Sequence, residues 1–168
     1  MFPYTMPAEW EQHDAVWLSW PHDPISFPFL QEAEEEYAAF VAEVSSSERV
    51  ELQVVNAEMQ ARVEAMLTAR GTDLARVRFH TDNYADIWFR DYGPLFVRAT
   101  SKDVPRANPL AASPLAMVKW IFNAWGGKYE TLMQDNAVPY RMRDLLGLPM
   151  IEPGIVMEGG SIEVNGQG

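Results

Sequence analysis

Two carboxylates in the sequence stand beside residue types that could bind an organic cation. Asp91 follows Arg90 in "WFRDYGP", three residues after Trp88, and Glu158 closes the apolar run of "GIVMEGG". A carboxylate accepts charge-assisted hydrogen bonds from a guanidinium, and an aromatic ring can stack on the same cation. Two carboxylates together match the several N–H donors that a guanidinium presents in one plane. Asp91, Glu158 and Trp88 are therefore candidate ligand-binding residues.

Both carboxylates also have a structural interpretation. Asp91 could form a local ion pair with Arg90 at the turn made by the following Gly-Pro. Glu158 could pair with an arginine, since a buried carboxylate without a partner is costly. The two glycines after Glu158 would let a backbone or a ligand approach closely. From the residues alone, both interpretations stay open.

The remaining motifs carry less chemistry. His13 and His22 lie in a Trp- and Pro-rich opening and His80 ends an expected strand, so structural or surface roles are favoured over metal binding. "WGGKY" lacks the frame of a phosphate-binding loop. "NGQG" is typical of a hairpin turn, "EAEEE" of a solvated helix face, and "SSS" of a linker or cap. The chain contains no cysteine, which excludes disulfides, cysteine zinc sites and a thiol nucleophile within it.

Composition narrows the class of protein. With 168 residues, 48% of them hydrophobic, one globular domain is expected. A net charge of −11 argues against nucleic-acid binding and is compatible with a cationic ligand. The chain has no apolar run of the roughly 18–20 residues that span a bilayer, and its first residues do not resemble a signal peptide. We therefore expect no membrane association and a cytoplasmic location.

The hydrophobic pattern predicts an α/β fold. A helix over 28–47 follows from the spacing of Leu30, Ala33, Tyr37, Phe40, Val41 and Val44, and a second helix over 57–70 ends at Gly71. A short helix is expected at 140–147 and an irregular segment at 100–114. Strands are expected at 15–20, 50–55, 77–81, 94–99 and 117–125, with two more forming a hairpin within 155–168.

Candidate site residues gather where expected strands end. "DNYADIWFRDYGP", "FNAWGGKYE" and "MEGGS" all combine polar, aromatic and glycine residues at such positions. Ligands of α/β proteins bind at strand ends, so these three segments could surround one site.

Four blocks in order resemble the agmatine deiminase and bacterial-type peptidylarginine deiminase family. They are "PAEWEQHDAVWLSWPHD", "ADIWFRDYGP", "FNAWGGKYE" and "MEGGSIEVNGQG", and the resemblance covers essentially the whole chain. Agmatine deiminases are the most similar members. The resemblance implies a pentein-type α/β propeller, in which ββαβ-like units surround a pseudo-fivefold axis. This chain would supply about two units and the start of a third, as the N-terminal portion of a single catalytic domain spanning 1–168, with no separate second domain.

The resemblance also implies a chemistry. Members of the family hydrolyse a guanidino group to a ureido group and release ammonia without a metal or organic cofactor. A cysteine thiolate forms a covalent thiouronium intermediate, a histidine moves protons, and two acidic residues hold the guanidinium. Matched block to block, Asp91 and Glu158 fall on the two acidic positions and Trp88 on an aromatic position near the substrate.

The chain departs from the family at the cysteine and the histidine. It has no cysteine, and none of its three histidines matches the family's catalytic position. We therefore expect a truncated agmatine deiminase, inactive alone, whose substrate is a small cationic guanidino compound on the route to putrescine and polyamines. Arginine in peptides is the alternative substrate. A non-catalytic guanidinium-binding or interaction module is the alternative class, and unpaired strand edges would favour self-association into a homo-oligomer.

Overall fold

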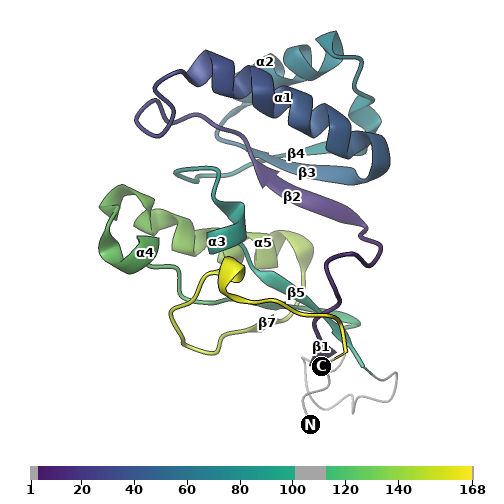
Figure 1. Cartoon of the computed structure of the whole chain (residues 1–168), viewed down its shortest axis with the longest axis vertical. Coiled ribbons are helices and arrows are strands. Elements are labelled where there is room, and N and C mark those ends of the chain that lie inside the picture. Colours follow the sequence, from purple (N-terminus) through teal and green to yellow (C-terminus); the bar gives the residue numbers. More distant parts are fainter. Residues whose placement is uncertain (1–3, 101–112, 168) are drawn as a thin grey trace. The chain divides into compact units, whose positions relative to one another are not determined.

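A computed structural model describes residues 4–100 and 113–167 of the chain (Figure 1). The chain divides into two compact units. The first unit in chain order, here called the parallel unit, comprises residues Gln12–Phe89. The other, here called the mixed unit, comprises Met1–Glu11 together with Arg90–Gly168. Each contains helices and a β-sheet, which confirms the α/β class predicted from the sequence.

The parallel unit is a strand–helix–strand–helix–strand arrangement. Its sheet has the order β2-β3-β4, with β2 at Ala15–Ser19, β3 at Arg49–Val54 and β4 at Val77–Thr81, all parallel. Two crossover helices connect these strands, α1 at Leu30–Ser47 and α2 at Ala57–Ala69, and a 3₁₀ turn, η1, precedes β4 at Leu74–Arg76. Gly71 follows α2 with φ of +75°, as the helix stop in the sequence predicted.

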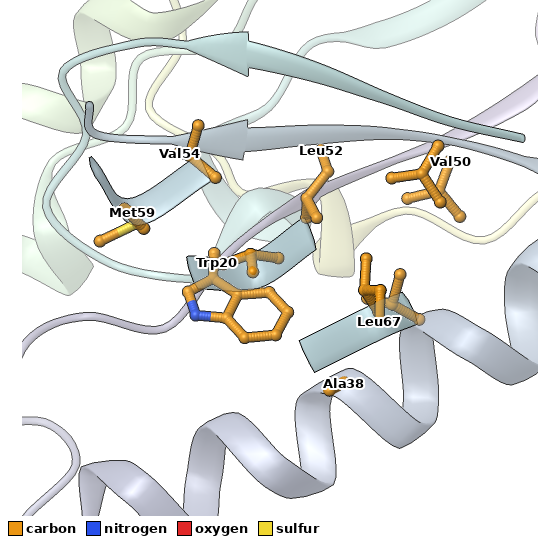
Figure 2. Close-up of a cluster of buried hydrophobic side chains, with 10 residues drawn as sticks. Trp20, Ala38, Val50, Leu52, Val54, Met59 and Leu67 are labelled. Atoms are coloured by element: carbon orange, nitrogen blue, oxygen red, sulfur yellow. The ribbon is translucent and has the colours of Figure 1, made fainter. Parts of the chain in front are cut away.

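One face of this sheet packs against both helices (Figure 2). Alternate residues of a strand point to the same face, so Val50, Leu52 and Val54 of β3 all enter the core. Trp20 is fully buried among them. The helices contribute a smaller set of side chains: Ala38 and Val41 from α1, and Met59, Val63 and Leu67 from α2.

The buried face of α1 differs from the predicted one. Phe40, expected in the core, is 48% exposed, whereas Glu34, expected on a solvated face, is buried. Glu34 accepts a hydrogen bond from the Trp20 indole at 2.7 Å and pairs with Arg62 of α2, which satisfies the buried carboxylate. The "SSS" segment is not a linker but the last turn of α1, where each hydroxyl donates to a carbonyl three residues earlier.

The mixed unit is built on a sheet of order β1-β5-β6-β7. Its strands are β1 (Tyr4–Thr5), β5 (Leu95–Ala99), β6 (Leu115–Val118) and β7 (Met150–Ile151); only the β6–β7 pair is parallel. Between β6 and β7 lie α4 (Ala124–Gly127), the 3₁₀ segment η3 (Glu130–Ala137) and α5 (Val138–Leu146). The short helix α3 is Phe89–Tyr92, and η4 is a 3₁₀ turn at Gly159–Ser161.

Two strand predictions in this unit are wrong. The strand expected over 117–125 is shorter: β6 ends at Val118, Ile121 then makes an isolated bridge to Val156, and from Ala124 onward the chain turns in the left-handed conformation. The hairpin expected within 155–168 is absent from the described residues: Val156 makes one bridge to Ile121, and η4 then interrupts the extended chain. Most of the irregular segment expected at 100–114 lies outside the described residues. In the part of the chain that is described, no helix is long and apolar enough to cross a membrane.

Candidate active site

Asp91 and Glu158 come together in the mixed unit although 67 positions separate their numbers. Asp91 lies on α3 and Glu158 is the residue before η4. The segments that carry them meet at Gly159: a Cβ built on that glycine would lie 2.4 Å from the carbonyl oxygen of Arg90 and 3.4 Å from a methyl group of Leu95. Only glycine fits this approach, because no real Cβ lies so close to a backbone oxygen. The glycine after Glu158 therefore lets the chain next to Glu158 pack against the backbone next to Asp91.

The two carboxylates interact electrostatically. Burial raises the pKa of Asp91 above its ordinary value, and the neighbouring charge of Glu158 raises that pKa further. The positive charge of Arg90 and a side-chain hydrogen bond from Trp125 act in the opposite direction. Like charges held this close repel unless a cation lies between them. The pair is therefore arranged to gain most from a bound cation.

The local Arg90–Asp91 ion pair considered from the sequence is only part of the arrangement. The Arg90 guanidinium makes its salt bridge to Glu9, in the segment before Gln12. Its charge still favours ionisation of Asp91, but its salt bridge is with a different carboxylate. Because Arg90 makes its salt bridge to Glu9, the Asp91 carboxylate keeps acceptor capacity for a ligand.

Trp125 is a site residue that sequence reasoning missed. It lies on α4, where Ala124 and Trp125 have φ of 51° and 55°. Each side chain in that left-handed region costs about 1–2 kcal/mol, since its Cβ crowds the following carbonyl. Such strain in a non-glycine residue is a signal of function. The sequence placed its segment, "FNAWGGKYE", among the three that could surround one site, but nothing singled out Trp125 within it.

Trp88 lies in the parallel unit, at its C-terminal end. Its indole donates a hydrogen bond to Asp86 at 3.0 Å, and its side chain is 42% exposed. Asp86 is itself fully buried and accepts from the Ser26 hydroxyl at 2.5 Å. Trp88 is therefore held by a buried carboxylate while part of its ring remains accessible.

The three histidines have structural surroundings. His80 contacts Glu51 at 2.5 Å across neighbouring strands and stacks on Trp17 with ring centroids 4.7 Å apart. His13 pairs with Glu48 at 3.2 Å, and His22 packs edge-on against Tyr84. Among residues 4–100 and 113–167, no group of three or more His, Asp or Glu side chains is placed to hold a metal ion.

Comparison with known proteins places these features in a family. The family model of the Porphyromonas-type peptidyl-arginine deiminases matches residues 5–168. An agmatine deiminase of Medicago truncatula is 31% identical over 98% of this chain and 43% of its own length. An agmatine deiminase of Stutzerimonas stutzeri is 34% identical over 98% of this chain and 42% of its own length.

Solved structures agree with the sequence comparison. An agmatine deiminase of C. jejuni with substrate bound superposes with a TM-score of 0.78 and 26% identity, over 98% of this chain and 44% of that one. The agmatine deiminase of Enterococcus faecalis gives a TM-score of 0.80 at 24% identity, which is a likeness of fold. The chain spans less than half the length of each of these relatives. On the match of nearly its whole length, the chain belongs to the family of Porphyromonas-type peptidyl-arginine deiminases.

Proposed function

We propose that this chain contributes the substrate-holding carboxylates of an agmatine deiminase-type hydrolase. The reaction adds water to the guanidino carbon of agmatine and releases ammonia, which leaves N-carbamoylputrescine. The observation that carries the proposal is the electrostatic interaction of Asp91 with Glu158, which adds to burial in raising the pKa of Asp91. A guanidinium between them would donate hydrogen bonds to both carboxylates, and this would orient its carbon for attack.

The roles of this chain's residues follow from that arrangement. Asp91 and Glu158 accept hydrogen bonds from the guanidinium nitrogens and stabilise positive charge as the carbon becomes tetrahedral. Trp88 is proposed as a further substrate-binding residue from its position in the block that resembles the family. A cysteine thiolate outside this chain attacks the guanidino carbon, ammonia departs after protonation by a histidine also outside it, and water hydrolyses the thiouronium to release the cysteine.

The finer architecture is part of the proposal. The two units together would form the N-terminal portion of one pentein-type propeller domain, with ββαβ-like units around the site. We further propose a cytoplasmic enzyme of polyamine synthesis that uses no cofactor. Self-association through unpaired strand edges is expected, since β1 and β7 are the outer strands of the described four-stranded sheet.

Arginine in peptides is the second candidate substrate. The family model that matches this chain is described by peptidyl-arginine deiminases, whereas the curated relatives quoted above are agmatine deiminases. Both substrates present the same guanidinium to Asp91 and Glu158. They differ at the far end, where agmatine carries a free ammonium and a peptide carries amide groups.

Ammonia release tests the proposal and separates the two substrates. The protein from the complete reading frame is assayed with agmatine and with an acetylated arginine peptide, and the ureido products are identified by mass spectrometry. We expect agmatine to be converted with the higher kcat/KM. Preferential conversion of the peptide would replace the substrate assignment, and no turnover of either would favour a binding module over an enzyme.

A further inference from the structure

The turn at Ala124–Gly127 has four successive residues with positive φ. The values are 51°, 55°, 80° and 77°, and the first two belong to residues that carry a Cβ. Glycine adopts this conformation readily, whereas alanine and tryptophan do not. A left-handed turn of this length persists only where its surroundings determine it.

The surroundings that determine the turn are specific. The Asn123 side chain accepts a hydrogen bond from the Gly126 N–H at 2.8 Å, and the Asn123 carbonyl accepts one from Gly127 at 2.7 Å. The Trp125 ring lies edge-on against Phe122 and Tyr129, with centroids 5.3 and 5.8 Å apart. The two hydrogen bonds hold the backbone of the turn, and the two ring contacts hold the Trp125 indole.

The Trp125 side chain reaches the candidate site. Trp125 makes a side-chain hydrogen bond with Asp91, and an indole nitrogen can only donate. The bond therefore occupies acceptor capacity of the Asp91 carboxylate and limits rotation of that group. It also opposes the effects of burial and of Glu158, both of which disfavour the charged form of Asp91.

We propose that the strained turn at Ala124–Gly127 holds the Trp125 indole N–H against Asp91, making Trp125 a positioning residue for the carboxylate that grips the substrate guanidinium. The inference rests on the proposed function, because it assumes that Asp91 binds substrate. Asn123 acts on Asp91 only indirectly, because it stabilises the turn by accepting a hydrogen bond from the Gly126 N–H.

Substitution of Trp125 by phenylalanine isolates the hydrogen bond. Trp125→Phe keeps an aromatic ring between Phe122 and Tyr129 but removes the donor. With less support for its charged form, the pKa of Asp91 should rise further, and substrate binding needs that charge. In the protein from the complete reading frame we expect kcat/KM to fall on the order of 10-fold at neutral pH, since one hydrogen bond to a charged group is lost. The acid limb of the pH profile should move to higher pH. A fall in activity with an unmoved acid limb would reduce Trp125 to a packing role and overturn the proposal.

A matched pair of glycines tests the turn itself. Gly126 and Gly147 both have positive φ, 80° and 64°, and a Cβ added at either meets nothing within 4 Å. Gly147 ends α5, away from Asp91 in sequence. Both alanine variants should therefore lose similar stability through backbone strain. Gly126→Ala should also lower kcat/KM severalfold, whereas Gly147→Ala should not. Equal kinetic effects would contradict a special role of the turn.

A spectroscopic measurement separates this inference from the proposed function. The indole N–H resonance of Trp125, identified by its loss in Trp125→Phe, should shift with pH as Asp91 titrates and should cease to do so in Asp91→Asn. That result would support the Trp125–Asp91 contact even if agmatine were not the substrate. A resonance unaffected by Asp91→Asn would overturn the inference while leaving the proposed function intact.

Discussion

At the scale of single residues, Asp91 carries a conflict between stability and binding. Burial and the charge of Glu158 both raise its pKa, so its ionised form is held at a cost in the folded protein. A guanidinium would relieve that cost on binding, which is the thermodynamic reason for placing two carboxylates together. Residues arranged for a ligand in this way destabilise the unliganded protein.

This conflict predicts a pH-dependent gain in stability for Asp91→Asn. Because the folded-state pKa is raised from its ordinary 3.8, the folded protein retains the Asp91 proton to higher pH than the unfolded chain does. The free energy of unfolding therefore falls as pH rises from about 3.8 through the raised pKa. Asparagine has no such charge, so Asp91→Asn should be more stable than the wild type at pH 7 and lose that advantage by about pH 3.

Urea denaturation at the two pH values measures the effect. Glu163→Gln is the control, because Glu163 is an exposed carboxylate in the same C-terminal segment as Glu158. Its stability should follow the wild type at both pH values within about 0.5 kcal/mol. An Asp91→Asn variant less stable than the wild type at pH 7 would mean that the carboxylate is structural.

At the scale of elements, the two adjacent glycines of "EGGS" differ in their surroundings, so substituting each one tests a different role. Gly159 lies against the Arg90 carbonyl, whereas a Cβ on Gly160 would meet nothing within 4 Å. Gly159→Ala must displace backbone and so move Glu158 away from Asp91, and kcat/KM should fall on the order of 10²-fold. Gly160→Ala should stay within a few-fold of the wild type. The comparison of the two rates checks whether the close approach positions the site, and equal rates would contradict it.

The core of the parallel unit predicts which side chains of α2 contribute most to stability. Leu67 is fully buried against β3, so Leu67→Ala should lower the free energy of unfolding by about 2–5 kcal/mol. Leu145, 54% exposed on α5, offers the same substitution at a surface position. Its replacement by alanine should cost less than about 1 kcal/mol. Chemical denaturation of both variants makes the comparison, and a smaller loss for Leu67→Ala than for Leu145→Ala would contradict the packing described here.

Periodicity predicted the elements of the parallel unit well and those of the mixed unit in part: β5 and α5 were predicted, whereas the strands after Val118 and within 155–168 were not. The helices α1 and α2 and the strands β2, β3, β4 and β5 lie within a residue or two of their predicted bounds, since a period near 3.6 or 2 is visible in sequence. The burial of Glu34 was invisible because it depends on Arg62, a partner on another helix. The left-handed conformation of Trp125 was invisible because residues that carry a Cβ rarely adopt positive φ, so the residue type gave no signal of it.

The candidate site follows the same division. Residue type and motif singled out Asp91 and Glu158, and the structure brings them into electrostatic contact. Their assignment to substrate binding stays a prediction, as does that of Trp88. The two glycines after Glu158 predicted a close approach there, but sequence could not indicate that Gly159 rather than Gly160 makes it, or that the Arg90 backbone is the partner.

At the scale of the whole molecule, the chain has a candidate binding site and lacks the family's nucleophile. It contains no cysteine, so these 168 residues cannot form a thiouronium intermediate. We expect the 168-residue chain to release no ammonia from agmatine above the background of buffer. A coupled ammonia assay checks this, with the protein from the complete reading frame as the positive control. Turnover that copurifies with the 168-residue chain would contradict the thiol mechanism.

The most direct test of a two-carboxylate guanidinium site is the kcat/KM for agmatine of Asp91→Asn, Glu158→Gln and their double variant, in the protein from the complete reading frame. Each single substitution should lower kcat/KM on the order of 10²-fold or more, because each removes a charged partner of the reacting group. The double variant should lose less than the product of the two, since both groups hold one cation. Glu163→Gln should match the wild type. Near-normal activity in either single variant would contradict its place in the site.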